Sequence, residues 1–217
     1  MNKNLDESRQ LRSIGKLVAL HLVPGIILTL AYVLLLKSGE FQGYPKVIVL
    51  GLSGIIGIVF GELGYLFYVA RKEQGSFNIF DILGLKSKLK AKELFLYSVT
   101  LFAIAGLLMS ASKPVTNFLL NYVFSFIPSL YNLVEDMGLF SRNIIIITIL
   151  VNFFLITIVL PIIEELYFRG FLLARMKWMG KYSVLVNTML FAIYHFWSPW
   201  MIVARVVAFL PLFYWVY

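Results

Sequence analysis

Two adjacent carboxylates directly follow a long uncharged stretch of this sequence. Glu164 and Glu165 follow residues 143–163, which carry no charge and are mostly Ile, Leu, Val and Phe. An ionisable side chain at membrane depth costs several kcal/mol, so it marks a site by default. From Glu164 to Lys177, where the next basic group gathers, is about thirteen residues or roughly 20 Å of helix. We therefore expect the two acids inside the membrane rather than among headgroups.

Helical spacing assigns different surroundings to the two acids. Glu165 and Arg169 are four residues apart, so they share a helix face and can form an ion pair. Such a pair offsets part of the cost of burying either charge. Glu164 points about 100° away from Glu165, because an α-helix has about 3.6 residues per turn. It is therefore free for chemistry.

A histidine lies as many residues after the expected turn at Met179 and Gly180 as Glu164 lies before it. Glu164 lies fifteen residues before Met179, and His195 lies fifteen residues after Gly180. If the chain turns at these two residues, an antiparallel hairpin puts Glu164 and His195 at one depth. We expect them close enough for one water to bridge them, with Phe191 packed beside the imidazole and shielding it. A hydrogen-bonded packing role is the alternative for His195.

Composition indicates the class of protein. The 217 residues are 60% hydrophobic and 14% charged, which favours an integral membrane protein over a soluble domain. The absence of cysteine excludes disulfides and thiolate sites. The first sixteen residues are polar and show no signal-type cleavage pattern, so the first apolar run is expected to stay as a span. The net charge of +8 fits cytoplasmic loops, and no basic–aromatic loop suggests a nucleic-acid partner.

These features predict an all-α, polytopic transmembrane helical bundle that forms one membrane domain over residues 1–217. Runs of about twenty apolar residues are long enough to span a bilayer. About six qualify: 16–36, 46–70, 94–111, 144–176, 182–198 and 200–217. The run 144–176 is too long for one straight span, so we expect a kink near Pro161 or a break near Gly170. Residues 77–95 and 115–140 are expected at the membrane surface; a short extra span at 116–127 is the alternative.

Basic residues predict the orientation. They gather in residues 1–16, 71–92 and 175–181, and the alternate loops are poorer in them. Because Lys and Arg accumulate in cytoplasmic loops, the N-terminus and these segments are expected in the cytoplasm.

The second expected span carries small residues and a third acid. Its glycines are spaced by three and four residues and form one stripe, which favours close helix packing: Gly51, Gly54, Gly57, Gly61 and Gly64. Glu62 lies in the same run. We expect a buried pairing or an interface position for it rather than catalysis.

Two short motifs resemble one known family. EELYFR at 164–169 matches a Glu-Glu-x-x-x-Arg pattern, and FAIYH at 191–195 matches Phe-x-x-x-His. Together they resemble the CPBP family, which includes type II CAAX prenyl endopeptidases and bacterial Abi-type proteins of bacteriocin processing and self-immunity. The specific part covers roughly 160–200, and the rest is similar only as a multi-span helical protein.

The resemblance implies an intramembrane endopeptidase of a bacterial cytoplasmic membrane, acting on a peptide or protein, with its core over 144–217. Glu164 would be the base that activates water, assisted by His195. Glu165 and Arg169 would orient and stabilise the site, with Phe191 in support. A divalent metal such as zinc, if used, would take Glu164 and His195 as ligands. Direct activation of water by the carboxylate and imidazole needs no metal.

One family feature is missing: a third motif on a later helix, with a His followed four residues on by Asn or Asp. No His follows His195, and His21 does not fit the spacing. Either the chain continues past residue 217, or the protein lacks the motif and acts by binding alone, as an immunity or partner protein. An ion-coupled carrier using Glu62 and the 164–165 pair is a third possibility, although no inverted repeat is visible. Arg205 either points into the cavity or snorkels.

Overall fold

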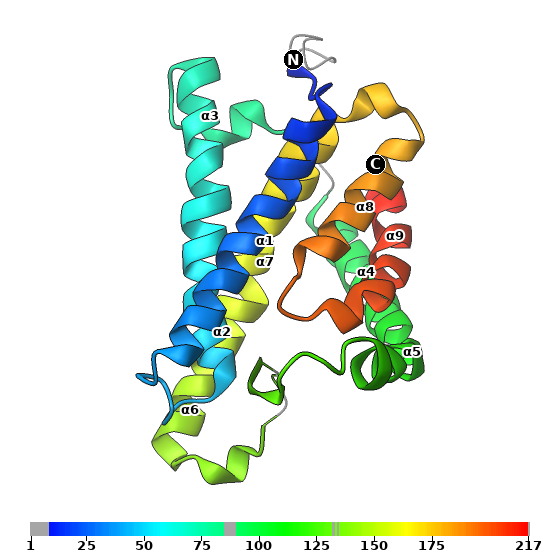
Figure 1. Cartoon of the computed structure of the whole chain (residues 1–217). Helices are drawn as coiled ribbons and strands as arrows, with labels where there is room; N and C mark the ends of the chain where they lie inside the picture. Colours follow the sequence, from blue (N-terminus) through cyan, green and yellow to red (C-terminus); the bar gives the residue numbers. More distant parts are fainter. Residues whose placement is uncertain (1–8, 85–89, 132, 134, 217) are drawn as a thin grey trace.

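The computed structural model describes residues 9–84, 90–131, 133 and 135–216, and all regular elements among them are helices (Figure 1). The α-helices are α1 (Ile14–Lys37), α2 (Lys46–Gly54), α3 (Gly64–Gln74), α4 (Ala91–Ala111), α5 (Lys113–Phe118), α6 (Arg142–Leu150), α7 (Leu160–Glu164), α8 (Tyr182–Tyr194) and α9 (Ile202–Val216). Wider π segments are η2 (Ile55–Leu63), η4 (Leu119–Val123), η7 (Val151–Val159) and η8 (Glu165–Leu173). Short 3-10 turns are η3 (Ile79–Ile82), η5 (Ser129–Tyr131), η6 (Met137–Leu139), η9 (Lys177–Met179) and η10 (Pro199–Met201).

Several elements join into long continuous helices. Residues Lys46–Gln74 form one helix, and Arg142–Leu173 form another. Serine caps fix where two helices begin, because a serine hydroxyl accepts a bond from a first-turn amide. Ser13 accepts from the Lys16 amide at 3.4 Å, and Ser141 accepts from the Ile144 amide at 3.5 Å.

Of the expected kink near Pro161 or break near Gly170, the break does not occur, and the kink stays a prediction. Arg142–Leu173 is a single helix of 32 residues that continues through Pro161 and Gly170. A proline inside an α-helix leaves a carbonyl without its amide partner. Here the preceding turns of η7 are in the wider π register, and the Leu160 amide bonds to the Leu155 carbonyl five residues back. We infer that this register accommodates Pro161 without a break.

The structure does not confirm the expected number of about six membrane spans. Within the described residues, three helices are long and apolar enough to cross a membrane: Ile14–Lys37, Lys46–Gln74 and Arg142–Leu173. A fourth candidate is the pair Phe95–Ala111 and Lys113–Val123, which is bent by 47° at its break. The last two expected spans instead form short apolar helices, Tyr182–Tyr194 and Pro199–Tyr214.

The shortness of α8 has a local cause. His195 leaves helical geometry with ψ 56°, and Ser198, the residue before Pro199, is also non-helical with φ −148° and ψ 63°. Proline disfavours helical geometry in the residue before it. The 13 residues of α8 reach about 20 Å, less than the roughly 30 Å of a bilayer core. The chain then turns back into α9. The tip of this hairpin, residues 195–199, lies partway along the long helices (Figure 1).

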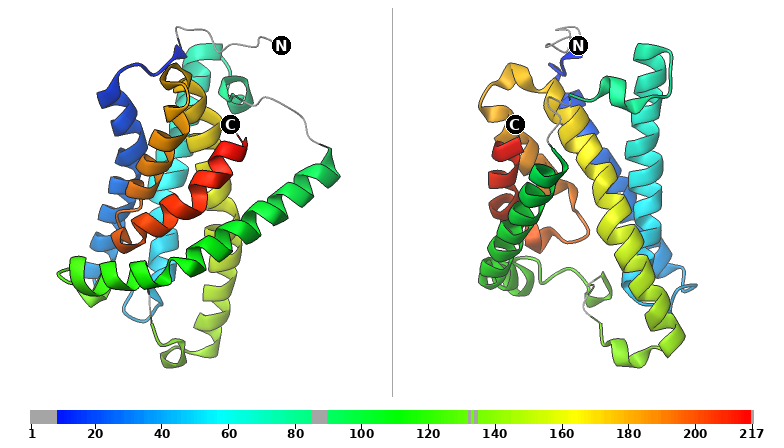
Figure 2. Two further views of the ribbon diagram at one scale, coloured as in Figure 1. Left: turned by 90° about the vertical axis from the view of Figure 1, so that its right-hand side faces the viewer. Right: turned by 180° about the vertical axis from the view of Figure 1, so that it is seen from behind.

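The helices pack in two groups. α1 lies along η2 and contacts α8, and α7 packs against η2. On the other side, α9 packs against α8 and against α4, which crosses the bundle obliquely (Figure 2). The glycine stripe serves packing as expected. A Cβ on Gly54 would overlap Leu160, and one on Gly57 would lie 2.6 Å from the Leu28 Cβ.

The basic segments lie together, as their alternation along the chain requires. Residues 9–16, the C-terminal end of α3 and the turn after η8 are all at one end of the bundle (Figure 1). The assignment of that end to the cytoplasm stays a prediction.

Candidate active site

The two glutamates occupy different surroundings, as their spacing indicates. Glu165 forms the expected ion pair with Arg169. The Glu165 side chain is 53% exposed, whereas that of Arg169 is only 10% exposed. The guanidinium carbon of Arg169 lies 3.6 Å from the centre of the Phe213 ring and 5.1 Å from that of Phe191. The ion pair and the two rings therefore hold Arg169 in one position between the long helix and the hairpin.

Glu164 is turned into the bundle. It is the last residue of α7 and is partly buried. The Tyr194 hydroxyl lies beside its carboxyl group, and the guanidinium groups of Arg169 and Arg205 are near enough to interact with it electrostatically. This carboxyl group therefore has cations close by, and it forms no ion pair with any residue in the described part of the chain.

His195 stands just past the end of α8, one residue beyond the last helical position. Its Nδ1 lies 2.8 Å from the Phe191 carbonyl oxygen, an acceptor. In the neutral imidazole this assigns the proton to Nδ1 and leaves Nε2 as the acceptor. The Phe191 ring packs edge-on against the imidazole at 4.8 Å, as expected from the sequence, and Trp197 lies at 4.8 Å. The ring is thus fixed with one nitrogen available.

Arg205 enters the site from α9. It donates from Nη1 to the Ser198 carbonyl at 3.0 Å and from Nη2 to the Ser198 hydroxyl at 2.6 Å. Only 7% of the residue is exposed, so it does not snorkel to the surface. It interacts electrostatically with both Glu164 and His195. The sequence left open whether Arg205 points into the cavity or snorkels to the membrane surface. In the structure it points inward.

The third acid also belongs to this cluster. Glu62, from η2, is fully buried, and neither carboxyl oxygen has a hydrogen-bond partner in the described part of the chain. It lies close to Glu164 and to the Tyr194 hydroxyl. The expected burial of Glu62 is confirmed. Its place next to Glu164 was not foreseen, because only the contact of η2 with α7 creates it.

The structure therefore brings the predicted residues together with three others, Glu62, Tyr194 and Arg205. Glu164 and His195 share Arg169 and Arg205 as electrostatic neighbours. A water bridge between the two stays a prediction. His21 lies elsewhere: it is buried between α1 and α8, where its Nε2 is 3.1 Å from the Asn187 side-chain oxygen and its Nδ1 is 2.8 Å from the Leu17 carbonyl. That position indicates a packing role.

The donor set does not fit a zinc ion. Zinc in proteins usually has three or four side-chain ligands drawn from His, Cys, Asp and Glu. Among the residues that the structure describes, no three side chains of these types are gathered where they could hold a metal ion. The mechanism proposed below is therefore written with water, carboxylate, imidazole and guanidinium alone.

Long apolar helices around a buried cluster of carboxyl, imidazole and guanidinium groups define an integral membrane protein with a polar centre. Residues 146–217, about a third of the chain, match the family described as type II CAAX prenyl endopeptidase Rce1-like, which is a protease family. This match confirms the resemblance to the CPBP family. Comparison with curated proteins and with solved structures gave no match.

Proposed function

We propose that this protein is an intramembrane endopeptidase of the CPBP type, with its peptidase core over residues 144–217 of a single membrane domain. The observation that carries the proposal is the cluster itself. A partly buried carboxyl group, Glu164, lies among two guanidinium groups that it shares with an imidazole whose Nε2 is available. The Rce1-like match over the same residues supports it.

In the proposed reaction, Glu164 accepts a proton from a water molecule while the water oxygen attacks the carbonyl carbon of the scissile peptide bond. Nε2 of His195 accepts the other hydrogen bond of that water and so orients it. The proton then passes from Glu164 to the nitrogen of the leaving amine as the C–N bond breaks. The second proton of the water stays on the new carboxylic acid, which transfers it to the amine, so the products are a carboxylate and an ammonium group. Glu165 and Arg169 position the end of the long helix, and Phe191 shields the imidazole.

Arg205 is the donor that stabilises the oxyanion in this proposal. Negative charge develops on the carbonyl oxygen during attack, and a preorganised donor stabilises it most effectively. Arg205 is buried, fixed by Ser198 and adjacent to both Glu164 and His195. Arg205 has five N–H donors, of which two bond to Ser198 and one makes a weak contact with the Met201 sulfur. The other N–H groups are available to an oxyanion.

Glu62 supports the charge of Glu164 by holding a proton itself. Two carboxylates facing each other away from water repel, so the pair is most stable with one proton between them. Glu62 is fully buried with no hydrogen-bond partner in the described residues, whereas Glu164 has Arg169 and Arg205 nearby. The proton therefore belongs on Glu62, and Glu164 remains the charged base.

The test is peptide cleavage by the purified full chain in lipid nanodiscs. Peptide pools with and without a prenylated C-terminal cysteine are incubated, and products are identified by mass spectrometry. E164Q and H195A are expected to lower the cleavage rate about 10²–10⁴-fold, the usual worth of a general base. E40Q changes an exposed loop glutamate in the same way and should cleave like the unmodified protein. Equal cleavage by E164Q would contradict the proposal and favour a protein that acts by binding.

A further inference from the structure

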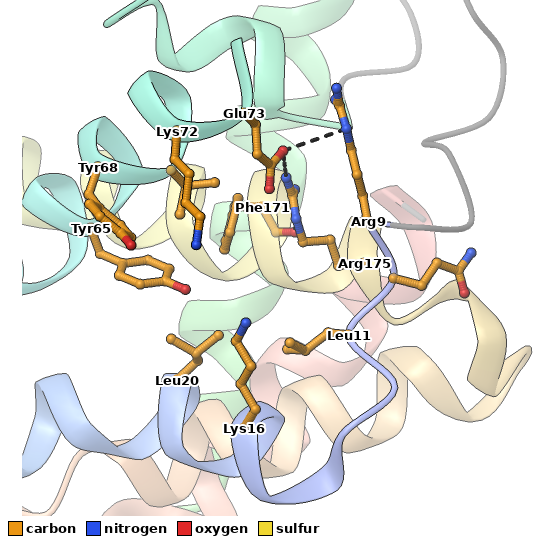
Figure 3. Close-up of a pocket in the computed structure, with 12 residues that line it drawn as sticks. Arg9, Leu11, Lys16, Leu20, Tyr65, Tyr68, Lys72, Glu73, Phe171 and Arg175 are labelled. Atoms are coloured by element: carbon orange, nitrogen blue, oxygen red, sulfur yellow. Dashed lines mark hydrogen bonds and ion pairs between the residues drawn. The ribbon is translucent and has the colours of Figure 1, made fainter. Parts of the chain in front are cut away.

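A separate cavity of about 310 Å³ lies at the basic end of the bundle (Figure 3). It is bounded by residues 9–11 and the first turns of α1, by one face of α3, and by Phe171 and Arg175 at the end of the long helix. Neither Glu164 nor His195 lines it. Four of its lining side chains are cationic, Arg9, Lys16, Lys72 and Arg175, and one is anionic, Glu73. The cavity thus has a strong excess of positive charge.

The single anion is already engaged. The Glu73 carboxylate lies 3.0 Å from the Arg175 guanidinium and 3.6 Å from that of Arg9. Arg175 is held firmly: it also donates to the Ile82 carbonyl at 2.8 Å and lies 3.9 Å over the Phe171 ring. Burial lowers the pKa of Arg175, and the Glu73 carboxylate opposes that shift. The Glu73 carboxylate therefore forms ion pairs with the two arginines at one side of the cavity.

The two lysines have no such partner. Lys16 on α1 and Lys72 on α3 extend into the cavity from opposite sides, and the Tyr65 hydroxyl points into the same space (Figure 3). Neither lysine forms an ion pair with any residue in the described ranges; Lys72 only passes within 5.8 Å of the Tyr68 ring. Two ammonium groups and a hydroxyl that converge on one space attract an anion with several acceptor oxygens.

We propose that this cavity binds a phosphate ester, the headgroup of an anionic phospholipid, through Lys16, Lys72 and Tyr65. The location supports a lipid source, because the cavity opens among the basic segments at one end of apolar helices, where anionic headgroups gather on the cytoplasmic face. The volume is at the lower end of ligand pockets and suits a headgroup rather than a whole lipid. Leu20 and Val69 also line the cavity and offer apolar surface next to the cations. The proposal does not depend on peptidase activity.

The experiment measures stabilisation of the purified full chain in neutral detergent. Dioleoylphosphatidylglycerol, dioleoylphosphatidylcholine, glycerol 3-phosphate and inorganic phosphate are each titrated, and the unfolding temperature is followed by tryptophan fluorescence. The phosphatidylglycerol titration should raise the unfolding temperature, and phosphatidylcholine should not. In K16Q/K72Q the apparent affinity for phosphatidylglycerol should fall about 25-fold, since each lysine near an anionic headgroup contributes about 1 kcal/mol, or about fivefold.

A matched double variant separates a site from general surface charge. K177Q/K181Q removes two lysines at the same end of the bundle that do not line the cavity, and it should bind like the unmodified protein. K16R/K72R keeps the charges and should retain most of the affinity. Equal weakening in the two glutamine double variants would overturn the proposal. Stabilisation by the soluble phosphates but not by phosphatidylglycerol would overturn the lipid assignment.

Discussion

Arg205 of α9 closes the tip of the α8–α9 hairpin by donating two hydrogen bonds to Ser198, one to its hydroxyl at 2.6 Å and one to its carbonyl at 3.0 Å. The guanidinium is therefore fixed, before any substrate binds, where it interacts electrostatically with both Glu164 and His195. A fixed charge needs little reorganisation when an oxyanion forms, which is the condition for strong stabilisation.

The first prediction concerns this arginine. R205A should lower kcat about 10²–10³-fold, the usual loss when one oxyanion donor is removed. R205K keeps the charge but not the two-bond fork, so it should recover only part of the rate. Cleavage by nanodisc-embedded protein measures the effect, with R142A, at the exposed start of α6, as the matched control. Full kcat in a folded R205A variant would exclude Arg205 from the reaction.

The second prediction distinguishes the two neighbouring carboxyl groups. If Glu62 holds the shared proton, E62Q mimics its neutral form and should cleave within a fewfold of the unmodified protein. E164Q removes the charged base and should lose about 10²-fold or more. The cleavage rates of both variants on one substrate show which carboxyl group is the base, provided that the two variants have equal unfolding temperatures. The reverse pattern, with E62Q inactive and E164Q active, would exchange the two roles.

The third prediction tests helix packing at the glycine stripe. A methyl group at Gly57 would lie 2.6 Å from the Leu28 Cβ and 2.9 Å from the Pro24 carbonyl oxygen, so α1 must move away. G57A should therefore reduce the free energy of unfolding by about 1–3 kcal/mol, as overpacking does. G61A adds the same methyl group to the same helix at an ordinary 3.8 Å from Pro24 and should change little. Denaturant titrations in detergent measure both; equal stability of the two variants would show that the helices pack differently.

The fourth prediction concerns orientation. The chain has no cysteine, so single cysteines report their own position. Glu40 lies in the loop after α1, and Lys181 lies in the turn before α8 at the opposite end of the bundle. With the basic end in the cytoplasm, a membrane-impermeant maleimide should label E40C in intact cells and K181C only after the membrane is opened. Labelling of K181C alone in intact cells would invert the orientation.

The sequence by itself determined the features that depend on local spacing and composition. The apolar runs indicated a membrane protein, and the four-residue interval between Glu165 and Arg169 indicated their ion pair, which forms within a single helix whatever surrounds it. The four-residue interval between Phe191 and His195 likewise indicated their contact, although His195 lies just past the end of α8. Gly180, with φ +55°, lies at the expected turn, because few other residues adopt that backbone region.

Tertiary structure decided which helices meet and how deep each one reaches. Hydropathy registers apolar residues but not helix length, so it could not separate the short helix α8 from a membrane span. The side chain of Glu62 faces Glu164 only because η2 packs against α7, about a hundred residues further along the chain. Arg205 could have extended to the headgroups with the same sequence around it; the bonds to Ser198 direct it inward. The first of these contacts joins residues from distant helices, and the second depends on how the chain turns between α8 and α9. The periodicity within one helix encodes neither of them.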